Sequence, residues 1–427
     1  MRQGPSASAS ARGRRAAVGF ILVSVWLDVL SLGVIIPVFA PLIQTQFTHG
    51  DASAAAWYMG LSSTVWAAAQ FFGAPVLGAL SDRFGRRPVL LISLFGLAFD
   101  YLVMAFAPSL GWLFLARVIS GFTAAGMAVA SAYIADVVEP EKRAQTFGYI
   151  GAAWGVGFIV GPAIGGLLGD ISLRAPFLAA AALTFVGALY GAFVLPESLK
   201  PENRASFAWS RANPVGSLGF LASHRELLPL SIMNLLLQTA HYVLPTIFVL
   251  YASNRYGWTL SQTGVALALT GVCNIIVQGF LVKRVVAWIG EWGAVMAGLV
   301  FGGLGFAIYG LAPTGWSFLI GTPVFGLIGL FGPGFQGLVT RRVAATEQGR
   351  LQGANGSLVG LAGVVAPTMF GFTYAWFVAP GHPHIPGSAF LLAASLHAIA
   401  ALIAVAVMAR APQASPIRTE SFERERL

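Results

Sequence analysis

The sequence contains little charge and a single cysteine. Only 10% of its 427 residues are charged and 57% are hydrophobic, whereas a soluble globular domain carries about 25% charged residues. Water is therefore excluded as the main solvent of this chain, and lipid takes its place. The lone Cys273 excludes a disulfide within the chain. It lies in an apolar run, and we interpret it as a small packing residue.

The groupings needed for catalysis, metal binding and nucleotide binding are missing as well. The sequence has no HExxH motif, no cysteine–histidine set, no serine nucleophile elbow and no P-loop. We therefore expect no enzyme activity, no metal and no cofactor. The net charge of +9 does not indicate nucleic acid, because no soluble basic module with interleaved aromatic residues is present and membrane proteins collect Lys and Arg in cytoplasmic loops.

What the sequence has in abundance is apolar stretches long enough to cross a membrane. A membrane-spanning helix needs roughly 20 mostly apolar residues, and twelve stretches qualify. The first, which follows Arg15, is longer than a signal peptide and has no convincing small-residue cleavage site. The predicted spans cover residues 17–39, 57–80, 88–108, 112–134, 145–169, 175–195, 228–252, 261–285, 292–311, 316–339, 351–378 and 388–409.

The basic residues predict how these spans are oriented. With both termini in the cytoplasm, 22 of the 25 Lys and Arg residues fall in cytoplasmic segments, and only Arg174 and Arg255 fall outside. Arg117 lies within a span. Positive charge collects on the cytoplasmic side, and one missed span would scramble this alternation. The asymmetry therefore supports both the orientation and the number of spans.

The longest polar stretch between spans divides the chain into halves of six spans each. We interpret this stretch as a cytoplasmic linker with a short amphipathic helix. The halves echo each other, since Gly161-Pro162 in the fifth span corresponds to Ala366-Pro367 in the eleventh. We therefore predict an all-α membrane protein of two pseudo-symmetric six-helix bundles, with the substrate site near the midplane between them. The predicted parts are an N-terminal bundle over 1–195, a linker over 196–227, a C-terminal bundle over 228–410 and a cytoplasmic tail over 411–427.

The most specific motif follows the second span and reads Gly78-Ala-Leu-Ser-Asp82-Arg83-Phe-Gly85-Arg86-Arg87-Pro88. Its glycines permit a tight turn and a close approach of helices. Asp82 can hold charge partners across helix ends, and Arg86 and Arg87 anchor the loop on the cytoplasmic face. The alternative is an ordinary positive-inside loop, but the combination of glycine, aspartate and paired arginine is more specific than that. The loop resembles the signature of the major facilitator superfamily.

Two spans carry motifs that resemble the drug–proton antiporter branch of that superfamily. Residues 115–121 in the fourth span, which include Arg117, are similar to the drug–proton motif of the branch. Small residues at helical spacing in the fifth span resemble its antiporter motif. We interpret them as a packing face on which a leak-proof closure depends. They are Gly157, Gly161, Pro162, Gly165 and Gly166.

Within this branch the resemblance narrows to tetracycline efflux transporters. It covers nearly the whole chain, with similar segments at 27–37, 57–58, 99–101, 254–258 and 351–353. The resemblance implies a proton-driven exporter of a bacterial-type inner (plasma) membrane, with tetracycline as the first candidate substrate. Two positions depart from that family, because Asn274 stands where it has a histidine and Gly302 where it has an aspartate.

Two carboxylates lie well inside the predicted spans. A charged side chain at the bilayer centre costs about 2.5–3.5 kcal/mol on insertion scales, so it should have a partner or a function. We favour Asp28 as a proton or cationic-substrate site over structural hydrogen bonding. Asp100 and Arg117 lie at a similar depth and could form either a structural ion pair or one that breaks on protonation or substrate binding. Because burial favours the neutral form of a carboxyl group, we predict proton coupling at Asp28, Asp100 and Arg117, all in the first half.

Neutral polar residues within the spans are candidates for substrate contact or for hydrogen bonding between helices. Gln70, Asn274 and Gln336 match cavity positions of the family by local alignment. His241 can titrate at physiological pH, although a lone histidine in a span is more often a packed hydrogen-bonding residue. We predict these four residues as substrate contacts.

The leading hypothesis is a proton-coupled secondary transporter that exports a drug-like molecule by alternating access. Its expected partners are a small-molecule substrate, protons and the lipid bilayer, and it is expected to function as a monomer. An alternative within transport is proton-coupled uptake or export of a metabolite, which the antiporter-type fifth span disfavours. A membrane-embedded enzyme and a non-transporting receptor are alternatives from other classes, and proton-coupled flux would exclude the receptor.

Overall fold

The structure is a computed structural model that describes residues 5–124, 126–206 and 216–410. Most of these residues are helical. The helices are α1 (Pro5–Leu42), α2 (Ala52–Phe84), α3 (Arg86–Phe106), α4 (Leu110–Thr123), α5 (Gly126–Val137), α6 (Pro140–Ile171), α7 (Ala175–Val194), α8 (Gly219–Ser223), α9 (Leu228–His241), α10 (Val243–Tyr256), α11 (Leu260–Ile276), α12 (Val282–Leu311), α13 (Gly315–Gly326), α14 (Phe331–Thr340), α15 (Gln348–Val378) and α16 (Ser388–Arg410).

Eleven helical stretches of the described chain are long and apolar enough to cross a membrane. The longest, Leu260–Leu311, has 52 residues, which would extend about 78 Å as a straight helix, more than twice the hydrocarbon thickness of about 30 Å. It turns at Gly290, whose φ of 73° and ψ of 178° are not helical. The stretch therefore crosses twice, and the predicted all-α architecture of twelve crossings is confirmed.

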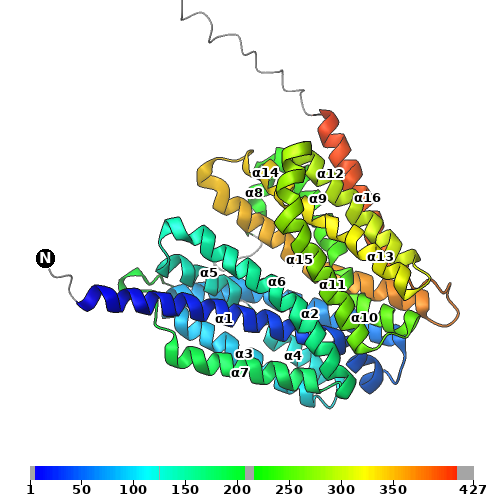
Figure 1. The fold of residues 1–427 in the computed structure, drawn as a ribbon, viewed down its shortest axis with the longest axis horizontal. Helices are drawn as coiled ribbons and strands as arrows, with labels where there is room; N and C mark the ends of the chain where they lie inside the picture. Colours follow the sequence, from blue (N-terminus) through cyan, green and yellow to red (C-terminus); the bar gives the residue numbers. More distant parts are fainter. Residues whose placement is uncertain (1–4, 125, 207–215, 411–427) are drawn as a thin grey trace, which may run out of the picture.

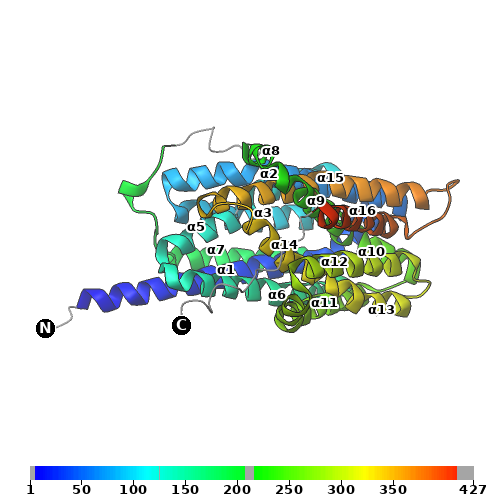
Figure 2. The ribbon, with the colours of Figure 1, turned by 90° about the horizontal axis from the view of Figure 1, so that it is seen from above.

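The crossings form two groups that lie side by side (Figure 1). Helices α1 to α7 make up the first group and α9 to α16 the second, and they diverge towards the left of Figure 1, where α1 begins. Figure 2 shows α1 extending beyond the other helices on this side. We call this the open end; it carries the connections around residues 84–86, 137–140, 194–206, 216–228, 281–292 and 340–348. The opposite, closed end carries the connections around residues 42–52, 106–110, 171–175, 256–260, 311–315 and 378–388.

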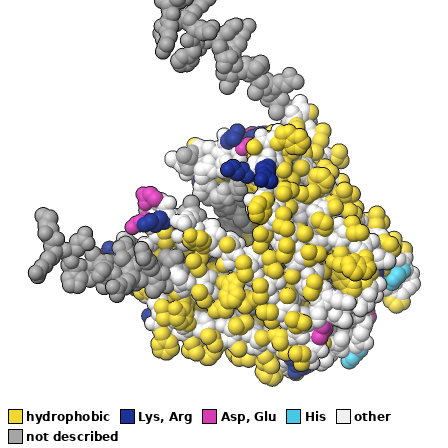
Figure 3. Space-filling model, in the orientation of Figure 1, with side chains coloured by type: hydrophobic (Ala, Val, Ile, Leu, Met, Phe, Trp, Pro, Cys, Tyr) yellow, Lys and Arg dark blue, Asp and Glu magenta, His cyan; other side chains and the backbone are white. Residues whose placement is uncertain are grey.

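The outer surface of both groups is apolar (Figure 3). Large side chains such as Phe193, Trp288 and Ile171 are more than four-fifths exposed, which a soluble protein rarely tolerates in such number. Most of the Lys and Arg side chains visible in Figure 3 lie towards the open end. This distribution is what a bilayer, acting as the solvent of the helices, requires.

The two groups touch through helices that cross from one half to the other. In the first contact, α6 packs on α11, and a side chain at Gly264 would collide with the carbonyl of Pro162. In the second, α15 packs on α2, and a side chain at Gly60 would collide with the carbonyl of Pro367. A glycine therefore faces a proline carbonyl on both sides of the interface, and the two contacts are arranged like a pseudo-twofold pair.

The second helix runs further than the sequence pattern indicated. It was expected to end near residue 80, but α2 continues to Phe84 and ends at Gly85, whose φ is 112°. Gly78 therefore lies inside a helix, with no heavy atom within 4 Å of the place its Cβ would occupy. The prediction that this glycine makes a tight turn or a close helix contact is wrong; Gly85 alone makes the turn.

The linker contains less helix than expected within the described residues. Its longest helix is α8, with five residues, which is too short to form an amphipathic surface of its own. Residues 207–215 of the predicted linker and the predicted tail over 411–427 lie outside the described residues.

The second group is held together by aromatic rings. Tyr309 stacks on Phe318 with 4.0 Å between ring centroids, and the Tyr251 hydroxyl donates to the backbone oxygen of Tyr309 at 2.7 Å. All three side chains are buried. Buried aromatic side chains therefore fill the second group's half of the closed end.

Candidate functional site

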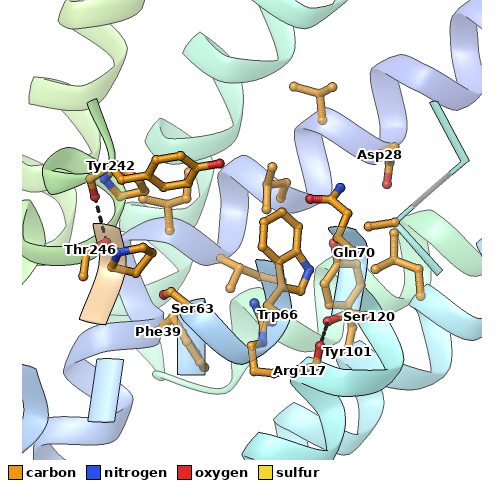
Figure 4. Close-up of a pocket in the computed structure, with 18 of the residues that line it drawn as sticks. Asp28, Phe39, Ser63, Trp66, Gln70, Tyr101, Arg117, Ser120, Tyr242 and Thr246 are labelled. Carbon is orange, nitrogen blue, oxygen red and sulfur yellow. Dashed lines mark hydrogen bonds between the residues drawn. The ribbon is translucent and has the colours of Figure 1, made fainter. Parts of the chain in front are cut away.

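A cavity of about 220 Å³ lies between the two groups. Most of its lining comes from α1 to α4 of the first group, and the second group contributes Tyr242, Pro245, Thr246 and Pro367. Figure 4 shows how the polar and aromatic side chains converge on it. Pockets of this kind, mostly apolar with a few converging polar groups, are typical of small-molecule sites.

Asp28 reaches this cavity from α1. It is partly exposed and makes no hydrogen bond to another described residue. Gln70 of α2 lies between it and Trp66 in Figure 4. The structure therefore places a carboxyl group where both a substrate and a proton can reach it.

Asp100 and Arg117 lie close to each other, and their charges interact. No oxygen of Asp100 comes within 4 Å of a guanidinium nitrogen, so the two residues form no ion pair in this conformation. Arg117 instead lies over the Phe39 ring, 4.7 Å from its centroid, and contacts the Met104 sulfur at 2.8 Å. Asp100 is fully buried with neither carboxyl oxygen in a standard hydrogen bond.

Tyr101 lines the same cavity, and its position in the sequence did not indicate a function. It is buried in α3 and lies in the cavity wall together with Asp28 and Arg117. The position directly after Asp100 was visible in the sequence, but adjacent residues point to different sides of a helix. Only the arrangement of the four neighbouring helices places Tyr101 on the side of Asp28.

The cavity has an aromatic wall that sequence reasoning also missed. Phe39 of α1, Trp66 of α2 and Tyr242 at the start of α10 all line it. Aromatic residues are common in membrane spans, so their identity alone gives no signal. The ring faces suit a flat, partly apolar ligand, and Arg117 and Gln70 provide hydrogen-bond donors at its edge.

Of the four predicted substrate contacts, the structure brings only Gln70 into this cavity. Asn274 accepts a hydrogen bond from Gln278 at 2.6 Å, and Gln336 accepts one from Gln352 at 3.1 Å. His241 has its ring 5.8 Å from that of Phe325. These three polar residues belong to the second group and do not line the cavity in this conformation.

The second group has no space for an acid at position 302. A Cβ on the buried Gly302 would lie 2.9 Å from the Nε2 atom of His397. His397 is itself buried, with Nδ1 against the backbone oxygen of Ala393 at 3.1 Å. Glycine at position 302 therefore fits the close packing of α12 against α16.

Most hydrogen bonds between the two groups of described residues lie towards the closed end, although Thr64 of α2 donates to the backbone oxygen of Val364 near the middle of α15 at 2.9 Å. Gln44 donates to the Asn254 side chain at 2.9 Å, and Ser53 donates to the backbone oxygen of Ala375 at 2.9 Å. Asp170 accepts from the backbone nitrogens of Leu260 and Ser261 at 3.1 and 3.3 Å. A carboxylate at the start of α11 also complements the positive end of its helix dipole. The cavity is thus sealed on this side.

The open end carries an ion-pair cluster within the first group. Arg86 pairs with Asp82 on α2 and with Asp136 on α5, the latter at 3.3 Å. Glu197 accepts hydrogen bonds from the backbone nitrogens of Arg86 at 2.8 Å and Arg87 at 3.3 Å. The cluster ties the ends of α2, α3 and α5 to the segment after α7. Arg83, by contrast, points away and lies over the ring of Phe84, 5.1 Å from its centroid.

Gly85 is needed at the centre of this cluster for two reasons. Its φ of 112° is rarely adopted by other residues, and a side chain there would collide with the Glu197 carboxylate. Glu197 lies in the short segment that follows α7. Its role as the cap of α3 required the fold.

The glycine-rich face of α6 packs in two directions. Gly157, Gly161 and Gly165 lie against α1, and a Cβ on Gly161 would be 2.8 Å from the Cα of Gly33. Gly166 and Pro162 face α11 of the other group. This face is therefore both the packing surface of α1 and a part of the contact between the two groups.

These features place the chain among known transporters. The sequence profile of the Major Facilitator Superfamily matches residues 21–367. The chain belongs to the Major Facilitator Superfamily. It is 37% identical over 358 residues to the class C tetracycline resistance protein of Escherichia coli, covering 83% of this chain and 89% of that protein. It is 34% identical to the class B protein of the same organism, over 83% of this chain and 87% of that one.

Solved structures show the same fold. The nucleoside transporter NupG superimposes with a TM-score of 0.76 at 14% identity, covering 92% of this chain and 99% of that one. The human organic anion transporter MFSD10 gives 0.66 at 23% identity, with 94% and 100% covered. The protein is therefore a multi-pass membrane transporter with a small-molecule substrate, and the prediction that it is not an enzyme is confirmed.

Proposed function

We propose that this transporter exports a tetracycline-type drug in exchange for protons that bind at Asp28. The observation that carries the proposal is the position of the Asp28 carboxyl in the wall of the cavity between the two groups. A proton and a drug that meet at the same cavity influence each other's binding directly. Relatives named as tetracycline resistance proteins, at 32% to 37% identity, support the choice of drug.

Orientation follows from the charges. We place the open end and both termini on the cytoplasmic side of a bacterial inner membrane. Residues 1–195 and 228–410 form the two bundles that move relative to each other. The concentration of basic residues in the open-end connections supports this orientation. The structure then represents a conformation that receives the drug from the cytoplasm, with the monomer as the working unit.

The exchange can be followed through the residues of the first group. A drug entering from the cytoplasm binds between Trp66, Gln70 and Arg117 and favours the charged form of Asp28, which gives up its proton. The contacts at the closed end then break, and those at the open end form. Outside, the drug leaves and Asp28 takes up a new proton. A proton gradient supplies the work because only one protonation state accompanies each direction.

Asp100 has a different part in this proposal. It is fully buried and does not line the cavity, so it is not the first group that a proton reaches. It directly precedes the cavity-lining Tyr101 on α3, and the neighbouring α4 carries Arg117, which suits a residue that responds to the charge of Asp28 and adjusts the position of Arg117. We assign coupling to Asp28, Asp100 and Arg117 together, with Asp28 as the proton-exchanging group.

The experiment is drug resistance in a bacterial host that lacks its own efflux pumps. The wild-type protein should raise the tetracycline concentration needed to stop growth, and Asp28→Asn should not. Asp51→Asn is the matched control, because Asp51 is exposed and caps α2 through backbone nitrogens, a role that asparagine fills equally well. Equal resistance in the wild type and Asp28→Asn, or no resistance in any of them at matched expression, would contradict the proposal.

A further inference from the structure

A second cavity, of about 40 Å³, lies inside the first group. It is lined by residues of α1, α3, α4 and α5, and it extends along α1 from Asp28 to Phe20. Eight residues of helix span about 12 Å, so this side cavity leads from Asp28 towards the open end. Asp28 lines both cavities, and every described residue that lines the side cavity belongs to the first group.

The side cavity has polar walls in an otherwise apolar setting. Ser24 and Ser93 line it from α1 and α3. Both hydroxyl oxygens are buried, and neither has a hydrogen-bond partner among the described residues. Ser93 is only 4% exposed. A buried hydroxyl without a partner is unfavourable, and two of them facing one small cavity are explained if water occupies it.

The size of the cavity agrees with this. A water molecule needs roughly 10–15 Å³ of such space and two or more polar partners, so the cavity holds up to about three. Asp28, Ser24 and Ser93 supply the partners. Among the described residues of its wall, Asp28 is the single titratable group. The other helices contribute Leu90, Ser93, Leu94 and Leu97 from α3, Thr123 and Ala124 at the end of α4, and Ala130 from α5.

We propose that the side cavity is a water-filled proton path that connects the Asp28 carboxyl with the cytoplasmic side while the main cavity holds a drug. An exchanger that binds its drug from the cytoplasm must release a proton to the same side. A drug bound against Trp66 and Gln70 obstructs the main cavity as an exit. The second face of Asp28, with Ser24 and Ser93 beyond it, supplies a separate exit. This inference rests on the proposed function.

The decisive test compares two variants of one residue. Ser93→Val and Ser93→Thr have nearly the same shape, but only threonine keeps a hydroxyl. Tetracycline is added to purified protein in weak buffer, and proton release is followed with a pH indicator in a stopped-flow instrument. Ser93→Val should release protons more slowly by about tenfold or more, the order expected when a proton transfer loses a positioned partner. Ser93→Thr should release them at the wild-type rate, and both should bind tetracycline normally.

Ser388 provides the matched control. Its hydroxyl is also buried and without a partner, but it lies at the start of α16, outside both cavities. Ser388→Val should therefore leave proton release unchanged. Equal rates in Ser93→Val and Ser93→Thr, whether both fast or both slow, overturn the proposal, because the hydroxyl then has no part in proton movement.

Water access can be tested without any drug. The background is Cys273→Ala, which removes the single native cysteine. The thiol of Ser93→Cys should react with Ag⁺, an ion close to water in size. A thiol that has bound Ag⁺ is then protected from labelling by a dye after denaturation. The thiol of Ser388→Cys should not be protected. Equal protection of both overturns the water-filled cavity. If tetracycline releases no protons from the wild type, the proposed function is contradicted. The Ag⁺ measurement needs no drug, so it tests the water-filled cavity separately from the proposed function.

Discussion

The glycine–proline contacts between the two groups predict that a single methyl group can change which way the transporter faces. A Cβ on Gly60 would lie 2.5 Å from the backbone oxygen of Pro367 and 3.0 Å from the Cα of Gly371. Backbone cannot move aside as a flexible side chain can, so α2 and α15 must separate. Gly60→Ala should therefore weaken the closed end while leaving each group folded.

The size of the effect follows from the cost of overpacking. Inserting a methyl group into well-packed surroundings costs about 1–3 kcal/mol, and 1.4 kcal/mol changes an equilibrium constant tenfold. Because Gly60 faces the other group, this cost falls on the closed arrangement rather than on the fold of the first group. We expect the equilibrium to shift away from closure at this end by about 5- to 150-fold.

The assay is cross-linking across the closed end. Cysteines replace Gln44 and Asn254, which hydrogen-bond to each other, in a Cys273→Ala background, and a short bifunctional maleimide joins them. Gly60→Ala should slow this cross-linking. Gly78→Ala lies on the same helix with open space around it and should leave the rate unchanged. If Gly60→Ala cross-links as fast as Gly78→Ala, the reasoning from glycine contacts is refuted.

Three further substitutions test other parts of the structure. Glu197→Gln removes the negative charge that caps α3 and should lower the unfolding free energy by about 0.3–1 kcal/mol, measured as thermal stability in detergent. Glu202→Gln, at an exposed position, should not lower it. Equal stability of the two variants would refute the cap. Gly290→Ala should destabilise the protein by about 1–2 kcal/mol because of the positive φ at this position. Gly349 also has open space around it but is helical, so Gly349→Ala should not destabilise the protein. A larger loss of stability in Gly349→Ala than in Gly290→Ala would contradict the turn. Arg117→Lys keeps the charge but loses the flat guanidinium over an aromatic ring, so the Kd for tetracycline should rise about 2- to 10-fold, and an unchanged Kd by fluorescence titration would count against drug binding there.

Sequence reasoning predicted the architecture well because composition and periodicity govern it. The twelve crossings follow from the lengths of the apolar stretches. The family resemblance follows from the loop after the second span and from the glycines of the fifth span. The turn between the eighth and ninth spans was expected between residues 285 and 292, and it lies at Gly290 within α12. The end of α2 was misplaced, since the three polar residues Ser81, Asp82 and Arg83 resemble a loop although they continue the helix.

The site was harder to predict because it is made by helices far apart in the sequence. Asp28 and Gln70 were identified, since a polar residue in a span is conspicuous. Tyr101 and Trp66 were not, because aromatic residues are common in spans and only packing decides which of them face a cavity. The path through Ser93 was missed for the same reason, as small hydroxyl residues usually serve helix packing.

The measurement that tests the account most directly is tetracycline transport into sealed liposomes as a function of an imposed pH difference, with the membrane potential clamped. One proton exchanged per drug makes the accumulation ratio change tenfold for each pH unit, since one unit corresponds to about 1.36 kcal/mol. The account predicts this slope for the wild type and no slope for Asp28→Asn. A wild-type protein that moves tetracycline indifferently to the pH difference, or an Asp28→Asn variant with an unchanged slope, would contradict it.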